Sequence, residues 1–249
     1  MSGAGSTVPP LPGAVGLSGL SVYPWGTEDG LHGGSPHLHL CCSEAYVVVG
    51  GHGRLQTLTV AGGAAELPLT AGDVVWFTPG TIHRAVDDED LQVVVAMENS
   101  GLPEAGDAVL TLPAEHLRDP DAYAAATSLA GPDGQPSPER ARARRDLAVA
   151  GFLELRERTT AGDTGALAAF HEAAAALVRP RVPDWRERWA AGALAAATRT
   201  GERLDALAGG GAPHLRAAGV HRLSRPTEPV LGMCGFLSPY LPEHASPAG

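Results

Sequence analysis

Two histidines separated by one residue, then a glutamate and a third histidine, constrain this chain more than any other feature. His37 and His39 lie in a strand-like run, and residues two apart on a β-strand point to the same face. Glu44 opens the next apolar run and is expected on the strand beside the two histidines. His83 follows a stretch of turn residues and is expected on the opposite side of the site. Three imidazoles and one carboxylate suit a divalent transition metal such as Fe, Mn, Ni or Zn. Because such donors must converge from rigid elements, the pattern favours a β-barrel with a metal centre inside.

Short strand-like runs separated by turn residues fill the region 16–112. The runs cover residues 20–25, 37–41, 44–49, 55–60, 65–69, 73–78, 83–87, 91–97 and 108–112. Glycine, proline and aspartate gather between them, at 50–51, 62–63, 72–73, 79–80 and 87–90. Short strands at such even spacing are typical of a β-sandwich or a small barrel.

The first part of this pattern resembles the first sequence motif of the cupin superfamily. That motif places His-x-His, a glutamate and a glycine at fixed spacing, and His37, His39, Glu44 and Gly51 fall on it. Leu31 stands where the motif begins with a glycine, which is a departure. The departure affects a turn and leaves the three ligand positions intact.

The second part resembles the second cupin motif. Gly72, Gly80 and His83 match its spacing. Thr78 stands in place of the usual proline and Asp87 in place of the usual asparagine. All four ligand positions of the family are therefore present, and the resemblance covers residues 16–112, which is under half of the chain.

The resemblance implies a fold, a cofactor and a range of functions. The implied fold is mainly β, a double-stranded β-helix (cupin or jelly-roll) barrel, here with a C-terminal α-helical extension. The implied cofactor is one divalent transition metal ion (Fe, Mn, Ni or Zn) held by His37, His39, Glu44 and His83. The expected function is metal-dependent chemistry on a small polar molecule in the barrel, foremost as a dioxygenase-type oxygenase. A sugar or sugar-phosphate isomerase or epimerase, and a non-catalytic small-ligand-binding cupin, stay open as alternatives. The family expectation for assembly is a homodimer.

Strand periodicity nominates further residues near the site. Tyr46 shares the face of Glu44, so it is the candidate catalytic acid or base, with simple packing as the alternative. Arg84 neighbours His83 and is expected to point away from the metal. On the run 73–78, either Trp76 and Thr78 or Val75 and Phe77 face the cavity. Candidates for the far wall are Gln56, Met97 and Asn99.

The remainder of the chain has a different period. Residues 1–15 are expected to form a flexible N-terminal tail, 113–213 an α-helical extension, and 214–249 a C-terminal tail that packs back on the barrel. Ser137 and Pro138 begin one helix, and others are predicted over 164–178, 184–200 and 202–207. The basic cluster 140–145 has acidic neighbours and is predicted to be a solvated helix face.

Composition excludes several classes of function. The formal net charge of −10 disfavours nucleic-acid binding. No run approaches the roughly 20 apolar residues of a membrane-spanning helix. The 3 cysteines indicate no disulfide framework, and no signal peptide is visible, so we expect a cytoplasmic protein with a small-molecule substrate.

Overall fold

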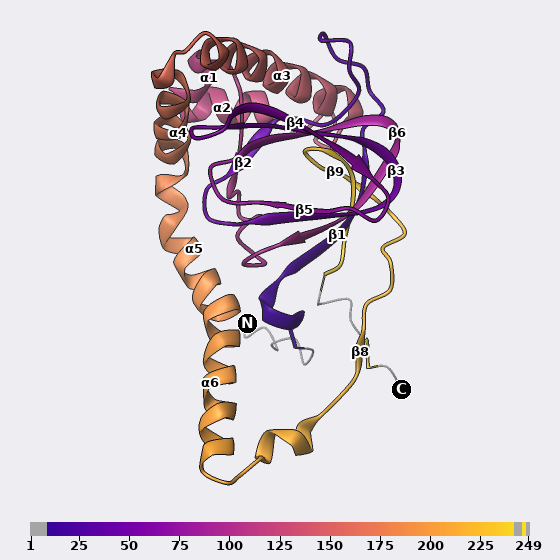
Figure 1. Ribbon diagram of the computed structural model, residues 1–249, viewed down its shortest axis with the longest axis vertical. Helices are drawn as coiled ribbons and strands as arrows, with labels where there is room; N and C mark the ends of the chain where they lie inside the picture. The colour runs from indigo at the N-terminus through magenta and orange to yellow at the C-terminus, as the bar shows by residue number, and fades with distance from the viewer. Residues whose placement is uncertain (1–8, 242–245, 248–249) are drawn as a thin grey trace.

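Seven strands in the first half of the chain and two near its end form one antiparallel sheet system (Figure 1). The computed structural model describes residues 9–241 and 246–247, so residues 1–8 of the predicted N-terminal tail and parts of the predicted C-terminal tail lie outside the described residues. The strands of the first half are β1 (Gly16–Val22), β2 (His37–His39), β3 (Glu44–Thr59), β4 (Gly63–Thr70), β5 (Val74–Phe77), β6 (Ile82–Met97) and β7 (Ala108–Leu110).

Two long strands, β3 and β6, run through both layers of the barrel. Residues 44–48 of β3 pair with 93–97 of β6 and, on the other side, with β5. Residues 53–58 of β3 pair with 82–87 of β6 and with β4. The first layer continues from β6 through β1 to β10 (Gly235–Pro239) and β9 (Val230–Leu231), and the second from β6 through β2 to β7. This strand order is that of a double-stranded β-helix, which confirms the predicted fold class.

A corner in β3 and β6 replaces the turns that the sequence suggested. The register between the two strands shifts from Val48 to Gly53, where both bend from one layer to the next. At Gly51 φ is +66°, and a Cβ atom there would collide with the carbonyl oxygens of Glu89 and Asp90. The prediction of four separate strands here was wrong, because glycine lets the paired strands bend without separating.

In the described part of the chain, six α-helices follow the seven barrel strands of the first half. They are α1 (Ala114–Leu117), α2 (Pro120–Thr127), α3 (Pro138–Thr160), α4 (Thr164–Val178), α5 (Val182–Trp189) and α6 (Ala195–Ala208). The Ser137 side chain accepts a hydrogen bond from the Arg140 backbone N–H at 3.3 Å, as expected of an N-cap. The predicted break between residues 200 and 202 is absent. A π-helical turn, Ala190–Leu194, instead joins α5 to α6, and α6 continues through Gly201.

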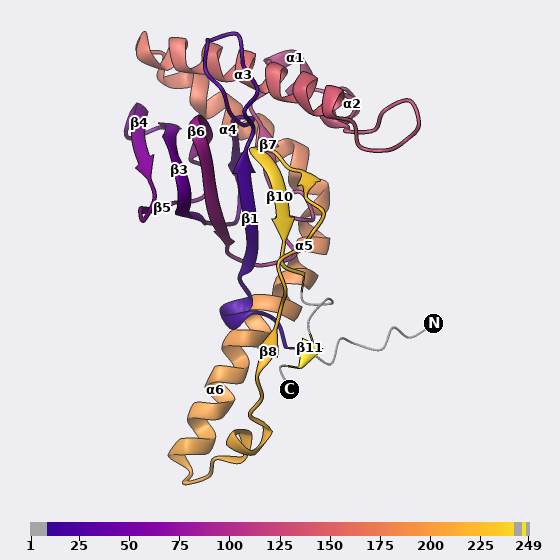
Figure 2. The same cartoon turned by 90° about the vertical axis from the view of Figure 1, so that its right-hand side faces the viewer.

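Helices α1 to α4 cover the second layer of the barrel, and α6 extends away from it (Figures 1 and 2). Leu38, which points away from its two histidine neighbours, joins one apolar cluster with Phe152 of α3 and Phe170 of α4. All three residues of β2 are buried. A strand that is covered on both faces carries apolar side chains or, as here, buried ligands on both faces.

The predicted solvated face of α3 is wrong for two of its arginines. Arg144 and Arg145 are buried, because they lie in the same helical stripe as Ala141 and Ala148, at spacings of three and four residues. Arg145 donates to the carbonyl oxygens of Trp25 at 2.7 Å and Gly26 at 2.9 Å, so it joins α3 to the barrel.

The end of the chain returns to the barrel after the helices. β10 pairs with β1, with Leu20 opposite Leu237. A separate short pair joins β8 (His221–Arg222) to β11 (Ser246–Pro247). The first barrel layer therefore contains strands from both ends of the chain, and Figure 2 shows β10 beside β1.

Candidate metal centre

The four predicted ligands meet inside the barrel. Each of His37, His39, Glu44 and His83 is buried, and each offers a donor atom within 4.8 Å of the others. His37 and His83 are direct cross-strand partners on β2 and β6. We expected His83 on the far side of the barrel and Glu44 on the strand beside the His-x-His pair. The structure reverses this: β6 lies next to β2, and β3 brings Glu44 from the other layer.

Two donor atoms at the centre lack hydrogen-bond partners. Oε2 of Glu44 and Nε2 of His83 are both buried and unpartnered among the described residues. The Glu44 oxygen lies 3.1 Å from Nε2 of His39 and 3.1 Å from Nε2 of His83, without the alignment of hydrogen bonds. A buried carboxylate without a partner is strongly disfavoured, and a cation between these atoms removes that penalty. The donor set therefore fits a divalent transition metal ion.

The far side of each imidazole fixes its orientation. The Ser35 carbonyl oxygen lies 2.9 Å from Nδ1 of His37, and the Thr81 carbonyl oxygen lies 3.1 Å from Nδ1 of His83. Carbonyl oxygens only accept, so each Nδ1 carries the proton and each Nε2 presents a lone pair. This is the arrangement in which a histidine ligates a metal through Nε2.

Asp107 supports the third histidine and was missed by sequence reasoning. Its Oδ2 lies 3.3 Å from Nδ1 of His39, a close charge contact without the alignment of a hydrogen bond. Its two oxygens accept from the backbone N–H groups of Cys41 at 2.7 Å and Cys42 at 3.2 Å. The carboxylate thus holds the loop that links β2 to β3 and faces the ligand ring. An aspartate just before a short apolar run was the only signal, and its meaning depends on the fold.

Burial and neighbouring charges set the protonation of the site. Burial, assisted by the other two imidazoles, lowers the pKa of His37 well below its usual value, so its ring is neutral. For His39, burial lowers the pKa, but the contacts with Asp107 and Glu44 outweigh it and raise the pKa to about 9. Burial raises the pKa of Glu44, yet the close contacts and charge of His39 and His83 bring the net shift downward. Glu44 is therefore a carboxylate, as a metal ligand must be.

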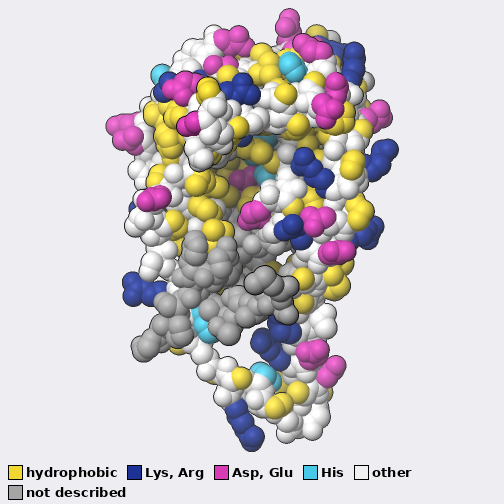
Figure 3. Space-filling model, turned by 180° about the vertical axis from the view of Figure 1, so that it is seen from behind, with side chains coloured by type: hydrophobic (Ala, Val, Ile, Leu, Met, Phe, Trp, Pro, Cys, Tyr) yellow, Lys and Arg dark blue, Asp and Glu magenta, His cyan; other side chains and the backbone are white. Residues whose placement is uncertain are grey.

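A cavity of about 410 Å³ opens beside three of the ligands, His37, His39 and Glu44. Its other lining residues include the apolar side chains of Leu20, Val95, Met97 and Leu237. Figure 3 shows histidine and acidic side chains amid hydrophobic ones near the middle of one face of the molecule. The size and lining suit a small organic molecule whose reacting end approaches the ligands.

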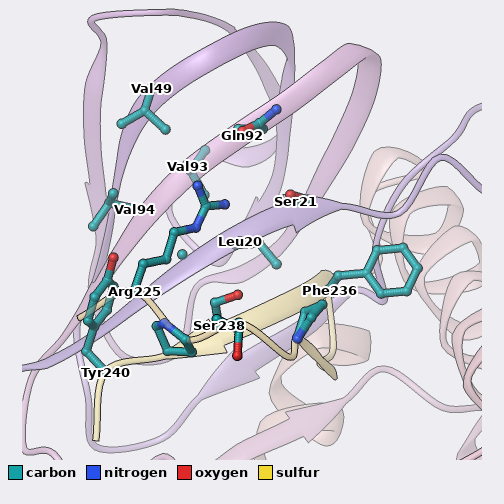
Figure 4. A pocket seen from close by; sticks show the side chains of 14 residues that line it. Leu20, Ser21, Val49, Gln92, Val93, Val94, Arg225, Phe236, Ser238 and Tyr240 are labelled. Atoms are coloured by element: carbon teal, nitrogen blue, oxygen red, sulfur yellow. The ribbon is translucent and has the colours of Figure 1, made fainter. Parts of the chain in front are cut away.

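A second cavity, of about 700 Å³, lies against β1, β6 and β10 (Figure 4). Arg225 is its one charged lining residue among the described residues, and Figure 4 shows it at the same end as Tyr240. This larger space has no cluster of metal-ligating groups. The smaller cavity is therefore the candidate site, because metal-ligating side chains line it.

Tyr46, the predicted acid or base, lies in the apolar core of the barrel. Its side chain is buried, its hydroxyl lies 3.9 Å from Sγ of Cys234, and its ring packs edge-on against Phe77 at 5.3 Å between centroids. Burial raises the pKa of Tyr46 well above its usual value. It is not among the residues that line the 410 Å³ cavity. Its catalytic role stays a prediction.

The other nominated residues divide between cavity and packing. Phe77 is buried and its ring centroid lies 4.1 Å from that of His83, while Trp76 is 72% exposed. Of the predicted far-wall residues, Met97 lines the cavity. Gln56 and Asn99 do not, so those predictions were wrong; Gln56 instead donates to Glu66 at 2.9 Å.

Arg84 points away from the metal centre, as predicted. It forms an ion pair with Asp29 at 2.6 Å and donates to Oγ1 of Thr27 at 2.8 Å. These contacts fasten the loop before β2 to the barrel. Among the described residues, no helix has the length and apolar character needed to cross a membrane.

No family model matches the sequence, and no curated protein matches it. Among solved structures, an uncharacterized conserved protein with a double-stranded β-helix domain from Klebsiella pneumoniae is 18% identical, with 33% of this chain and 64% of that chain covered and a TM-score of 0.26. A Cupin 2 conserved barrel domain protein from Salinispora arenicola is 24% identical over 39% of this chain and 72% of that chain, with a TM-score of 0.26. A putative sugar phosphate isomerase from Acidithiobacillus ferrooxidans is 24% identical over 33% of this chain and 47% of that chain, with a TM-score of 0.26.

Similarities of this size establish neither ancestry nor activity. This chain spans less than two thirds of the Klebsiella protein and under half of the isomerase. The fold assignment rests on the strand order described above and on the donors that this order brings together. By these features, the chain is a double-stranded β-helix barrel with a C-terminal helical extension.

Proposed function

We propose that this protein is a metal-dependent, dioxygenase-type enzyme that acts on a small polar molecule in the 410 Å³ cavity. One observation carries the proposal: the donor atoms of Glu44 and His83 are buried and unpartnered among the described residues, and Glu44 also lines this cavity. When bound, Fe(II) supplies the redox chemistry by which O₂ reacts with an organic substrate. His37, His39, Glu44 and His83 would hold it.

The cavity lining favours oxygenation over isomerisation. An isomerase or epimerase needs a positioned group that gains and loses a proton near neutral pH. Apart from the ligands, the titratable residues that line the cavity in the described part of the chain are Glu104, Arg144 and Cys234. Glu104 is exposed and accepts from the Gly101 backbone N–H at 2.7 Å. Burial raises the pKa of Cys234 to about 12, so its thiol keeps its proton. An oxygenase does not require such a group from the protein.

The chain's own residues have two further tasks in this proposal. Apolar side chains such as Leu20, Val95 and Leu237 exclude water from the reacting end of the substrate. Ser35, Thr81 and the Asp107 carboxylate keep the three imidazoles in place. A rigid ligand set positions the substrate against the metal without reorganisation.

The first test is metal content. Protein purified without chelator should carry close to one divalent transition metal ion per chain, and His83→Ala should lose most of it. His52→Ala is the matched control, because His52 is half-exposed and its contact is with Glu89 outside the site. Full metal retention by both His37→Ala and His83→Ala would place the metal elsewhere.

The second test is the reaction type. Iron-loaded protein mixed with a panel of small diols and diketones should consume O₂, and wild type should exceed His83→Ala by at least about 100-fold, since a lost ligand removes the bound ion. Turnover under strict anaerobiosis would contradict the oxygenase and favour the isomerase. Tight binding without turnover in either atmosphere would favour a non-catalytic binding protein.

A further inference from the structure

A buried arginine lines the same cavity as the metal ligands. Arg144 of α3 is only 7% exposed, and it lines the 410 Å³ cavity together with His37, His39 and Glu44. It comes from the helical extension, so the cavity is built from both the barrel and the helices. A guanidinium ion is rarely buried to this extent without a partner.

The donors of Arg144 are largely unused. Nη2 donates to the Gly232 carbonyl oxygen at 2.6 Å, which is an oxygen that also accepts from the Tyr23 hydroxyl at 3.0 Å. Nε is buried and has no hydrogen-bond partner among the described residues. No carboxylate of the described residues lies within ion-pair distance. Burial lowers the pKa of Arg144, and the smaller opposing effects of Tyr23, Tyr123 and Cys234 do not offset it.

The next residue of the helix shows what a satisfied arginine looks like here. Arg145 is buried even more completely, yet its donors reach Trp25, Gly26 and the Asp146 carboxylate at 2.9 Å or less. Both arginines help to join α3 to its surroundings. Of the two arginines, Arg144 alone has a buried N–H group without a partner among the described residues, and it alone lines the cavity.

The net charge of the buried groups indicates the charge of the ligand that would fill the cavity. A divalent ion (+2), Glu44 (−1), Asp107 (−1) and Arg144 (+1) sum to +1 in a buried region. Glu104 at the rim is exposed, so water screens its charge. One negative charge from a ligand would bring the buried sum to zero. A planar carboxylate matches the guanidinium fork, whereas a doubly charged phosphate would call for a second cation, and Arg144 is the one basic residue among the described residues that line the cavity.

We propose that the substrate of this cavity is a small organic monocarboxylate, whose carboxylate pairs with Arg144 while its apolar part packs on Leu20, Val95 and Leu237. The inference rests on the proposed function, because it names the substrate class of the same cavity. Arg144 is then a specificity-determining residue that separates acids from neutral analogues of equal shape. Through Arg144, the helical extension takes part in recognising the substrate.

The test compares acids with their amides. Acetate, 4-methylpentanoate and phenylacetate, each beside its amide, are titrated calorimetrically into the full chain, both metal-free and loaded with redox-inert Zn(II). In wild type at least one acid should bind about tenfold or more tightly than its amide, because hydrogen bonds to charged groups are the strong ones. Arg144→Gln should reduce that preference to about onefold. Arg145→Gln is the matched control and should retain it.

The outcomes separate this proposal from the proposed function. Acid preference that survives in Arg144→Gln would mean that the anion binds elsewhere, and it would overturn the proposal while leaving the metal centre intact. Equal binding of acid and amide in wild type for all three pairs would also overturn it. Failure to take up any metal would instead contradict the proposed function, and the metal-free titration would still decide on Arg144.

A second measurement covers the case in which Arg144→Gln does not fold. In ¹⁵N-labelled wild type, the acid should shift the Nε–H resonance of Arg144, identified by its disappearance in Arg144→Lys, and the amide should not. An unshifted resonance at saturating acid would overturn the proposal.

Discussion

Replacing Asp107 by asparagine should weaken metal binding although Asp107 never touches the ion. Its carboxylate lies 3.3 Å from Nδ1 of His39 and accepts from the backbone N–H groups of Cys41 at 2.7 Å and Cys42 at 3.2 Å. Asparagine keeps the size but turns one acceptor into a donor. Whichever way the amide faces, an N–H group of the ring or the backbone then meets another N–H group.

The magnitude follows from the role of such partners. Loss of a group that orients a ligating histidine typically lowers metal affinity about 10- to 100-fold. That corresponds to about 1.4 to 2.8 kcal/mol. We expect the upper part of this range, because the Asp107 side chain is fully buried and no water can replace the lost acceptor.

The assay is an equilibrium competition with a chelator of known affinity, performed with Zn(II) on the wild type and the variant. Asp73→Asn is the matched control: Asp73 also accepts from a backbone N–H, that of Thr70 at 2.8 Å, but lies at an exposed turn away from the site. Thermal unfolding of the metal-free proteins shows whether the variant folds. Equal zinc affinity in folded Asp107→Asn and wild type would refute the reasoning that this carboxylate organises the ligand set.

Two further predictions concern stability. Gly51→Ala should destabilise the barrel by more than about 1 kcal/mol in urea unfolding, because a positive φ and a backbone collision act together. Gly80→Ala is the control: φ is +85° there but the space around it is open, so this variant should lose less unfolding free energy. Equal losses in the two variants would contradict the role of the collision. Burial raises the pKa of Asp29, but hydrogen bonds from Arg84 and Thr27 outweigh it and lower the pKa from 3.8 to about 2. Such a carboxylate stabilises the fold above pH 3.8, and the contribution, about 2 kcal/mol, disappears as the pH falls towards 2. Asp29→Asn should abolish that part of the acid sensitivity, and an unchanged acid midpoint in unfolding curves would contradict it.

The His37 and His39 pair could be predicted because it depends only on residues that are close together in the sequence. His37 and His39 stand two residues apart on a strand, and spacing alone puts both rings on one face. The placement of the remaining two was not local. Which strand pairs with β2 depends on chain connections that periodicity does not encode, so His83 was expected opposite and lies adjacent.

Arg144 and Asp107 escaped sequence reasoning for different reasons. Arg144 stands in a run of arginines with acidic neighbours, which resembles a solvated helix face. Only the apolar stripe of Ala141, Ala148 and Phe152 reveals that it faces inward, and the charge masks that stripe. Asp107 stands just before the strand-like run 108–112, where no periodicity indicates which way its side chain points. Its role exists only because the fold brings it to His39, 68 positions earlier in the chain.

The pairing of β10 with β1 has a consequence for biosynthesis. Part of the wall of the ligand cavity is made of Gly232, Met233, Cys234 and Leu237, yet these residues emerge from the ribosome long after the four metal-binding side chains. A nascent chain that has reached the end of α4 therefore holds all the donors, with one side of their chamber still missing. We therefore expect the ligand cluster to be able to form before the cavity beside it is complete.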